Sequence, residues 1–130
     1  MAITKTSSTQ IGSWTNQGSD PVSSSIFDVS DAVACEIEVV MSNASAVPDP
    51  SQGSIDIEVY ECSDGTSGTA GDDPIFTGST LPDAQSWRAH FPMNVIASKY
   101  ILVVLKNNLK DSGGSAISAD FTINTIKTTV

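Results

Sequence analysis

Apolar and acidic residues alternate with a period of two in two segments near the middle of this chain, residues 33–41 and residues 55–61. Side chains on a β-strand point alternately to opposite faces, so each segment has one apolar face and one carboxylate face. Each segment therefore predicts a half-buried strand of an antiparallel sheet, with its acidic side toward solvent or toward a partner.

The rest of the chain continues in short apolar segments separated by turn residues. Residues 99–106 are apolar on both faces, which predicts a central strand covered on both sides. Strands of similar length recur about every ten residues, and no window predicts an amphipathic helix. This spacing predicts an all-β fold, an antiparallel β-sandwich of jelly-roll or immunoglobulin-like type, with about seven or eight strands and no substantial helix. Further short strands are expected at residues 26–29, 75–78, 86–91 and 117–124.

Residues 1–25 have a different character, with Ser, Thr, Gln, Gly and Asn surrounding the isolated apolar residues Ile3, Ile11 and Trp14. This segment is expected to be an N-terminal arm or an irregular first strand. Residues 26–130 are expected to form a single β-sandwich domain, because a chain of 130 residues can bury its own core. An arm that becomes ordered on a partner covers much surface, so its three apolar residues are candidates for a partner interface.

Pairing the two alternating strands as a hairpin, with their apolar faces together, brings four carboxylates onto one outward face. Like charges on neighbouring strands destabilise a sheet unless cations lie nearby. Arg88, Lys99 and Lys106 are candidates for those cations, and a basic partner surface is the alternative. This acidic face is a second candidate partner interface, formed by Glu36, Glu38, Asp56 and Glu58.

The same hairpin separates the two cysteines of the chain. Cys35 lies on the apolar face and Cys62 on the outward face, so a disulfide between them would need a bulge. Two separate thiols are therefore expected, as in a reducing compartment.

Charge limits the partners that this chain can have. Six Lys and Arg against fifteen Asp and Glu give a formal net charge of −9. Binding to nucleic acid or to an anionic membrane requires cations that displace counterions, so neither partner is expected. The N-terminal residues contain no apolar signal segment, and no stretch approaches the ~20 apolar residues of a membrane span. Synthesis in a cytoplasm without secretion is expected.

No constellation of residues in the sequence predicts catalysis. His90 is the single histidine, it faces away from Trp87 and Phe91, and no Gly-x-Ser-x-Gly motif is present. His and Cys are too few and too dispersed for a transition-metal site. The acidic loop at residues 64–73 offers oxygen ligands for Ca²⁺, but its spacing matches neither an EF-hand nor a nonapeptide repeat, so a solvated loop is expected. The sequence therefore predicts a protein that is not an enzyme and has no cofactor, with Ca²⁺ at residues 64–73 as the weaker alternative.

Four segments resemble parts of small β-sandwich virion proteins of tailed bacteriophages. Residues 27–32 have the sequence Phe-Asp-Val-Ser-Asp-Ala before the first alternating strand, and residues 55–65 end in Cys-Ser-Asp-Gly. Residues 76–82 and 98–104 look like the "apolar-Thr-Gly…Leu-Pro" and "Lys/Arg-Tyr-apolar-apolar-Val" strands of those proteins. The resemblance covers roughly residues 26–108. It implies a capsid decoration (cement) protein or another accessory virion component, and it assigns no site residue.

The first functional hypothesis is therefore a structural virion protein that decorates a capsid lattice. Its partner would be the major capsid protein or another virion protein, and it would form a homo-oligomer, with a trimer as one candidate. The alternative is a carbohydrate-binding or fibre- or tail-associated module. That alternative needs exposed aromatic residues, for which the candidates are Trp14, Tyr60, Trp87 and Tyr100.

Overall fold

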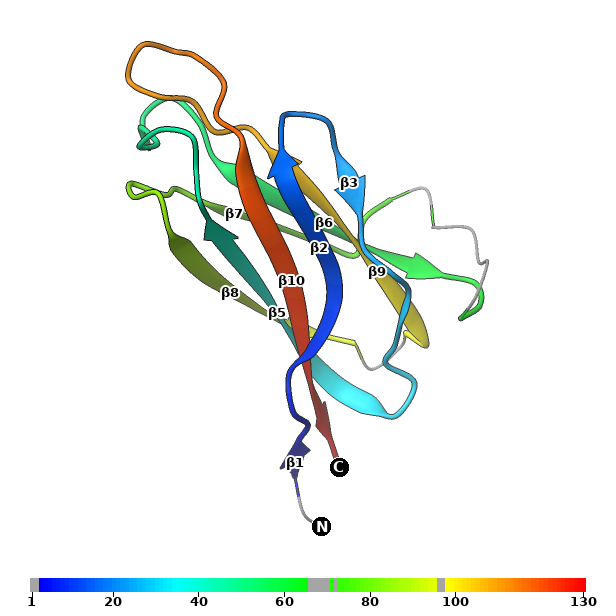
Figure 1. Ribbon diagram of the computed structural model, residues 1–130. Helices are drawn as coiled ribbons and strands as arrows, with labels where there is room; N and C mark the ends of the chain where they lie inside the picture. The colour runs from blue at the N-terminus through cyan, green and yellow to red at the C-terminus, as the bar shows by residue number, and fades with distance from the viewer. Residues whose placement is uncertain (1–2, 66–70, 72, 96–97) are drawn as a thin grey trace.

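Ten β-strands form two antiparallel sheets in the computed structural model, which describes residues 3–65, 71, 73–95 and 98–130 (Figure 1). No helix occurs within these residues. Three of the strands are only two residues long, which leaves seven strands of five residues or more. The predicted fold class, an all-β antiparallel sandwich, is confirmed.

The first sheet, called sheet A, has the strand order β1-β10-β5-β8, and β2 pairs with β10 on the side where β1 also lies. Its strands are β1 (Thr4–Lys5), β2 (Thr9–Gln17), β5 (Ala32–Ser42), β8 (Trp87–Asn94) and β10 (Ala119–Thr129). All neighbouring strands in sheet A are antiparallel.

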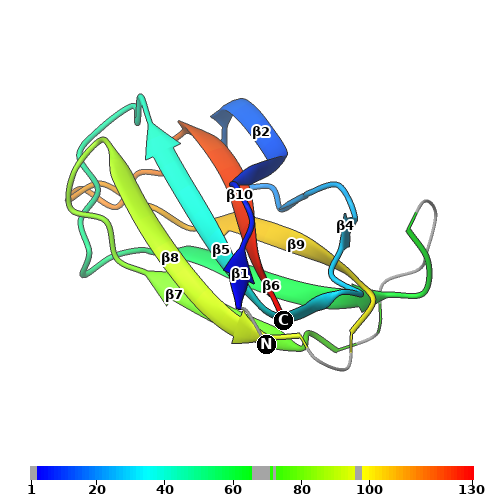
Figure 2. The same ribbon diagram turned by 90° about the horizontal axis from the view of Figure 1, so that it is seen from below.

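The second sheet, called sheet B, has the strand order β3-β9-β6-β7, and β4 pairs with β9. Its strands are β3 (Val22–Ser23), β4 (Phe27–Asp28), β6 (Ile55–Cys62), β7 (Phe76–Thr80) and β9 (Tyr100–Asn107). The two sheets lie face to face as separate layers (Figure 2). At one edge of the sandwich, the rings of Phe76 on β7 and Phe91 on β8 meet edge to face, with 6.4 Å between their centroids.

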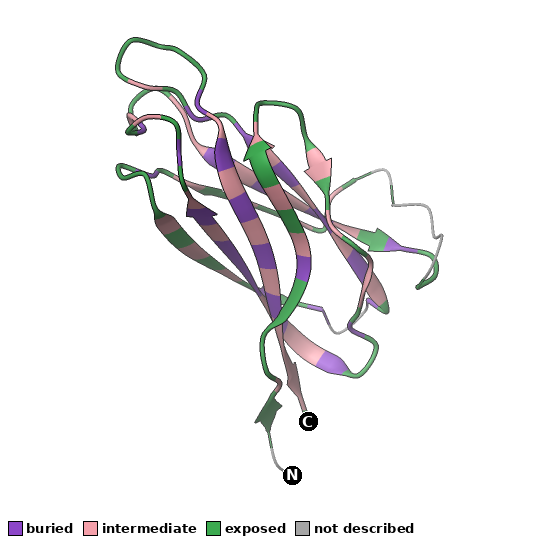
Figure 3. Ribbon diagram, viewed as in Figure 1, coloured by how far each residue is buried: buried purple, intermediate pink, exposed green. Residues whose placement is uncertain are grey.

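The core is formed by the inward side chains of both sheets, and burial alternates along the strands (Figure 3). On β5 the inward residues Ile37 and Val39 are at most 1% exposed, and the same holds for Ile57 and Val59 on β6. These are the apolar positions of the two alternating segments, so the period of two correctly predicted which side chains point inward.

The expected hairpin between the two alternating segments is wrong. β5 belongs to sheet A, where it pairs with β10 and β8, whereas β6 belongs to sheet B, where it pairs with β9 and β7. Residues 43–54 carry the chain from one sheet to the other. The two apolar faces do meet, but across the sandwich and not side by side. The carboxylates of β5 and β6 therefore lie on opposite outer faces of the molecule.

Strand β9 also differs from its prediction. It lies inside sheet B between β6 on one side and β3 and β4 on the other. Ile101, Val103 and Leu105 are fully buried, but the outward residues Leu102 and Val104 are only half-buried. In the described residues no strand packs over this outer face, so β9 is covered on one side only.

Residues 9–17 of the N-terminal segment form β2, an irregular strand of sheet A. Its register against β10 shifts twice. Asn16 adopts a left-handed backbone conformation, with φ of 51°. The Asn16 amide donates a hydrogen bond to Asp120 Oδ1 over 2.8 Å, which holds this turn of the chain against β10. Bulges of this kind on an edge strand oppose pairing with a further strand.

Both cysteines are free thiols, as expected, and both are buried. Cys35 faces the core. Cys62 lies opposite Tyr100 on the outward side of β6, yet it is only 4% exposed. The turn after β6 lies close to the Tyr100 ring, because a Cβ placed on Gly65 would lie 2.9 Å from it. The predicted outward position of Cys62 therefore does not expose its thiol to solvent.

Candidate functional site

On the outer face of sheet A, Glu38 of β5 lies at the centre of a polar cluster. Its side chain is only 10% exposed. Asn124 Nδ2 on β10 donates to Glu38 Oε1 over 2.9 Å, and Arg88 Nη1 on β8 donates to Glu38 Oε2 over 3.1 Å. The His90 ring, also on β8, links the two glutamates. Its Nε2 lies 3.3 Å from Glu38 Oε2, and its Nδ1 lies 2.8 Å from Glu36 Oε1.

This cluster is closed, because side chains of the chain itself contact both glutamates. Arg88 was among the cations expected from the sequence, and its role is confirmed. The part played by His90 was not expected. It follows from the register, in which Glu38 lies opposite His90, and that register becomes known only once β5 and β8 are known to be neighbours. A basic partner is not needed to hold these carboxylates together.

The outer face of sheet B carries a hollow of about 490 Å³ that is open to solvent. It extends over β6, β7 and the end of β9. Six of its eight lining residues have polar or charged side chains. The lining residues are Asp56, Ile57, Glu58, Thr77, Gly78, Ser79, Lys106 and Asn108.

Hydrogen bonds hold both carboxylates of the hollow in place. Asp56 accepts from the hydroxyls of Ser54 and Ser79, and its Oδ2 accepts from Asn108 Nδ2 over 2.6 Å. Glu58 Oε1 forms an ion pair with Lys106 Nζ at 2.5 Å, and Glu58 Oε2 accepts from the Tyr60 hydroxyl over 3.2 Å. Lys106 was also among the expected cations and is confirmed in that role.

Charge pairing shifts the titration of this ion pair. The hydrogen bond from Lys106 lowers the pKa of the Glu58 carboxyl below its ordinary value, and Glu58 in turn raises the pKa of Lys106. Both groups are thus held in their charged forms at neutral pH.

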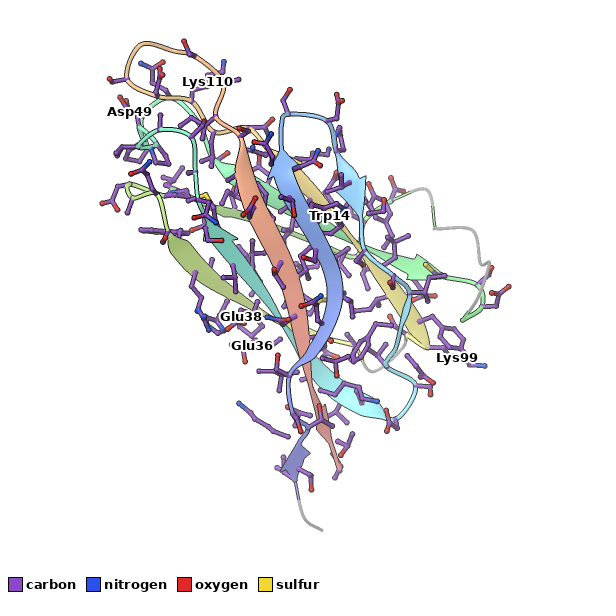
Figure 4. All side chains as sticks on the ribbon, in the orientation of Figure 1. Trp14, Glu36, Glu38, Asp49, Lys99 and Lys110 are labelled. Carbon is purple, nitrogen blue, oxygen red and sulfur yellow. The ribbon has the colours of Figure 1, made fainter. Side chains whose placement is uncertain are left out.

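The third expected cation, Lys99, lies elsewhere. It precedes Tyr100, which is opposite Cys62, so it lies beyond the end of β6 that is distant from Asp56. Figure 4 also places it well away from Glu36 and Glu38. The prediction that Lys99 offsets these carboxylates is wrong.

The three apolar residues of the N-terminal segment occupy three different environments. Ile3 is 73% exposed, whereas Ile11 is 6% exposed and belongs to the core of this chain. Trp14 is half-buried, packs against the core and lies over Gly12, where a Cβ would come within 2.3 Å of the indole (Figure 4). Only Ile3 of the three therefore presents most of its side chain to solvent.

The thiols offer little nucleophilic chemistry. Burial raises the pKa of Cys35 to about 11, and burial also raises the pKa of Cys62. Both groups are therefore thiols and not thiolates at neutral pH.

Among the described residues, no group of three or more His, Cys, Asp or Glu side chains is placed to hold a metal ion. Most of the acidic loop weighed for Ca²⁺, residues 64–73, lies outside the described residues. In the same part of the chain no helix is long and apolar enough to cross a membrane.

No protein-family model and no curated protein sequence matches this chain. Its fold is similar to several solved structures at low identity. The structure described as "CBM4 structure and function" has 11% sequence identity and a TM-score of 0.49. The match covers 83% of this chain and 60% of the chain in that structure.

The pili of Bacillus endospore appendages have 16% identity and a TM-score of 0.44, over 98% of this chain and 89% of theirs. The VP2 subviral particle of infectious bursal disease virus has 14% identity and a TM-score of 0.46, over 96% of this chain and 32% of its own. The chain thus spans 60% of the first structure and 32% of the viral one. Identities this low concern the fold and do not extend to ligands or partners.

Proposed function

We propose that this chain is a non-enzymatic structural protein of a virion, a decoration protein that binds the major capsid protein or another virion component. Its docking surface is the end of sheet A where the two termini meet. The observation that carries the proposal is a pair of exposed apolar side chains at that end, Ile3 at 73% and Val130 at 55% exposure.

The N-terminal strand is attached to this end by few contacts. β1 has two residues, Thr4 opposite Thr129 and Lys5 opposite Thr128, so Ile3 and Val130 continue the same antiparallel register. The Thr6 amide donates to the Lys127 carbonyl over 2.9 Å, and the Lys127 amide donates to Thr6 Oγ1 over 3.1 Å. A short edge strand that ends in apolar side chains can adapt to a partner at small cost, because little of its own packing is lost.

Two further observations support a structural role in a virion. The resemblance of residues 26–108 to small phage β-sandwich proteins supplies the setting. His90 and the two cysteines are engaged in structural contacts, since both nitrogens of His90 contact carboxylates and both thiols are buried. Binding as a homo-oligomer, with a trimer as one form, belongs to the same proposal.

Copy number on assembled particles is the first test. A decoration protein co-purifies with particles in a number that matches a capsid lattice, and quantitative mass spectrometry of purified particles measures that number. A few copies per particle would contradict decoration and favour the tail or connector. Absence from particles would overturn the virion proposal altogether. Sedimentation velocity of the free protein measures its oligomeric state.

The docking surface is tested by Ile3→Ser and Val130→Ser, singly and combined. Burying one such side chain is worth about 1.5–3 kcal/mol, so the double variant is expected to bind particles more than about tenfold more weakly. Leu81→Ser is the matched control, because Leu81 is also 55% exposed but lies in the connection before Trp87, at the opposite end of sheet A. Equal binding by the double variant and the control would exclude this end of the sheet as the docking surface.

A further inference from the structure

The open hollow on the outer face of sheet B has no role in docking through the termini. We propose that it is a binding site for a neutral saccharide, recognised by polar side chains of β6, β7 and β9 and by an apolar strip beside them. The site is distinct from the proposed docking surface, which lies at the end of sheet A.

The volume of the hollow and the polar side chains that line it suit a small polar ligand. Its volume of about 490 Å³ lies within the ~300–1,000 Å³ that is usual for small-molecule sites. Thr77 and Ser79 are exposed at its β7 side, and Asn108 is exposed at its other end. A ligand could therefore enter without any movement of the strands.

The polar groups in the hollow are oriented before any ligand arrives. Asp56 accepts hydrogen bonds from Ser54, Ser79 and Asn108, and Glu58 accepts from Lys106 and Tyr60. Side chains that are already fixed lose little conformational entropy when a ligand binds. Such preorganisation favours recognition by hydrogen bonds.

The remaining hydrogen-bonding capacity includes both donors and acceptors. The Lys106 ammonium has three N–H groups, of which one points to Glu58. The Asn108 amide has a second N–H and a carbonyl oxygen, and the Ser79 hydroxyl that donates to Asp56 keeps its lone pairs. A sugar hydroxyl both donates and accepts, so neighbouring hydroxyls of one ring match this mixture.

Charge argues against ionic ligands. Asp56 and Glu58 outnumber Lys106, so the formal charge of the hollow is −1, which disfavours phosphate and carboxylate groups. A basic peptide that bound at Glu58 would have to compete with Lys106, which is already paired with Glu58 at 2.5 Å. A neutral polar ligand meets neither difficulty.

An apolar strip borders the hollow on the same face. Tyr60 lies two residues beyond Glu58 on β6, and Leu102 and Val104 of β9 lie opposite Tyr60 and Glu58. All three side chains are half-buried, so part of each is open to solvent. An aromatic ring with its hydroxyl anchored to Glu58 offers its apolar body to the C–H face of a sugar ring.

The test uses the full-length protein on an array of neutral and acidic oligosaccharides, followed by amide NMR titrations with cellohexaose, xylohexaose and mannohexaose. Binding to neutral glycans is expected, with shifts of amides in residues 56–58, 77–79 and 106–108. Tetralysine and inositol hexakisphosphate serve as charged comparisons and are expected to cause no such shifts.

Lys106→Met is the decisive variant, because it removes a charge-assisted donor from the hollow. We expect binding at least about tenfold weaker. Lys127→Met is the matched control, since it breaks a similar lysine ion pair, with Asp31 at 2.8 Å, on sheet A. Thermal unfolding verifies that both variants are folded, and the control is expected to bind like the parent.

Three results would overturn the proposal: silence across the array and the three hexasaccharides, shifts confined to other residues, or unchanged binding by Lys106→Met. Shifts of the same amides by tetralysine alone would replace the saccharide with a basic peptide. Particle binding by Ile3→Ser and Val130→Ser is measured separately, so failure of the saccharide site and failure of the docking surface can be told apart.

Discussion

The outer faces of the two sheets begin from the same pattern and end differently. Each central strand contributes two outward carboxylates, Glu36 and Glu38 on β5 and Asp56 and Glu58 on β6. On sheet A the edge strand β8 places Arg88 and His90 over them, and Glu38 is left 10% exposed.

On sheet B the residues at the corresponding edge are small. The edge strand β7 contributes Thr77, Gly78 and Ser79, and the cation Lys106 comes from the strand on the other side. Thr77 on sheet B occupies the position that corresponds to His90 on sheet A, because Glu38 lies opposite His90 and Glu58 lies opposite Thr77. The volume of the side chains on the edge strand therefore decides whether an acidic face becomes a closed cluster or an open hollow.

The largest expected effect is a difference in stability between variants that lose a carboxylate on one outer face or the other. Glu38→Ala removes a carboxylate with three partners and little solvent contact, so we expect a loss of about 2 kcal/mol in the free energy of unfolding. Glu58→Ala removes a carboxylate at the wall of an open hollow and should cost clearly less. Urea denaturation of the two variants measures both values. Equal losses would mean that the two faces do not differ in closure.

A second prediction concerns acid. The pKa of Glu58 is lower in the folded chain than its ordinary 4.5, so the folded state favours the ionised form. The resulting stabilisation is fully present above pH 4.5 and is lost as pH falls through the folded-state pKa. Lys106→Met removes the main cause of the shift, so the dependence of unfolding free energy on pH below 4.5 should become shallower.

Lys5→Met serves as the control for this measurement, because Lys5 lies on β1 of sheet A. Its acid dependence should follow that of the parent. An unchanged acid slope in Lys106→Met would show that the ion pair on sheet B does not contribute to stability.

The smallest expected effect on stability comes from making sheet B like sheet A. Thr77→Arg places a long cationic side chain opposite Glu58, where sheet A has His90 opposite Glu38. Exposed ion pairs contribute about 0–1 kcal/mol, so the free energy of unfolding should change little. The hollow should be filled, and the amide shifts caused by neutral hexasaccharides should disappear. A variant that binds saccharides as before would show that the edge strand does not control access to this face.

Particular residues show how far the sequence alone could predict the structure. The period of two placed Ile37, Val39, Ile57 and Val59 inside, and the structure confirms all four. The same pattern could not say that β5 and β6 belong to different sheets, because any two amphipathic strands can face each other across a core or lie side by side. The single acidic face was therefore wrong, although each carboxylate does point outward.

Asn107 illustrates the same limit at one position. Asn107 and Asn108 are adjacent and chemically identical, so the sequence does not distinguish their roles. In the structure Asn107 is 2% exposed, and its amide donates to the carbonyls of Ile117 and Gln17 over 2.7 and 3.1 Å. Asn108, its neighbour, points instead to Asp56 in the hollow. Two identical residues thus have different roles, which depend on segments that are distant in the chain.

The sequence by itself determined the all-β class, the inward positions and the outward carboxylates, because strand pleating couples residue spacing directly to sheet face. Only the tertiary structure decided which strands are neighbours, which cations meet Glu38 and Glu58, and which outer face stays open. Those outcomes depend on register and side-chain volume between strands far apart in the sequence, and no local pattern contains that information.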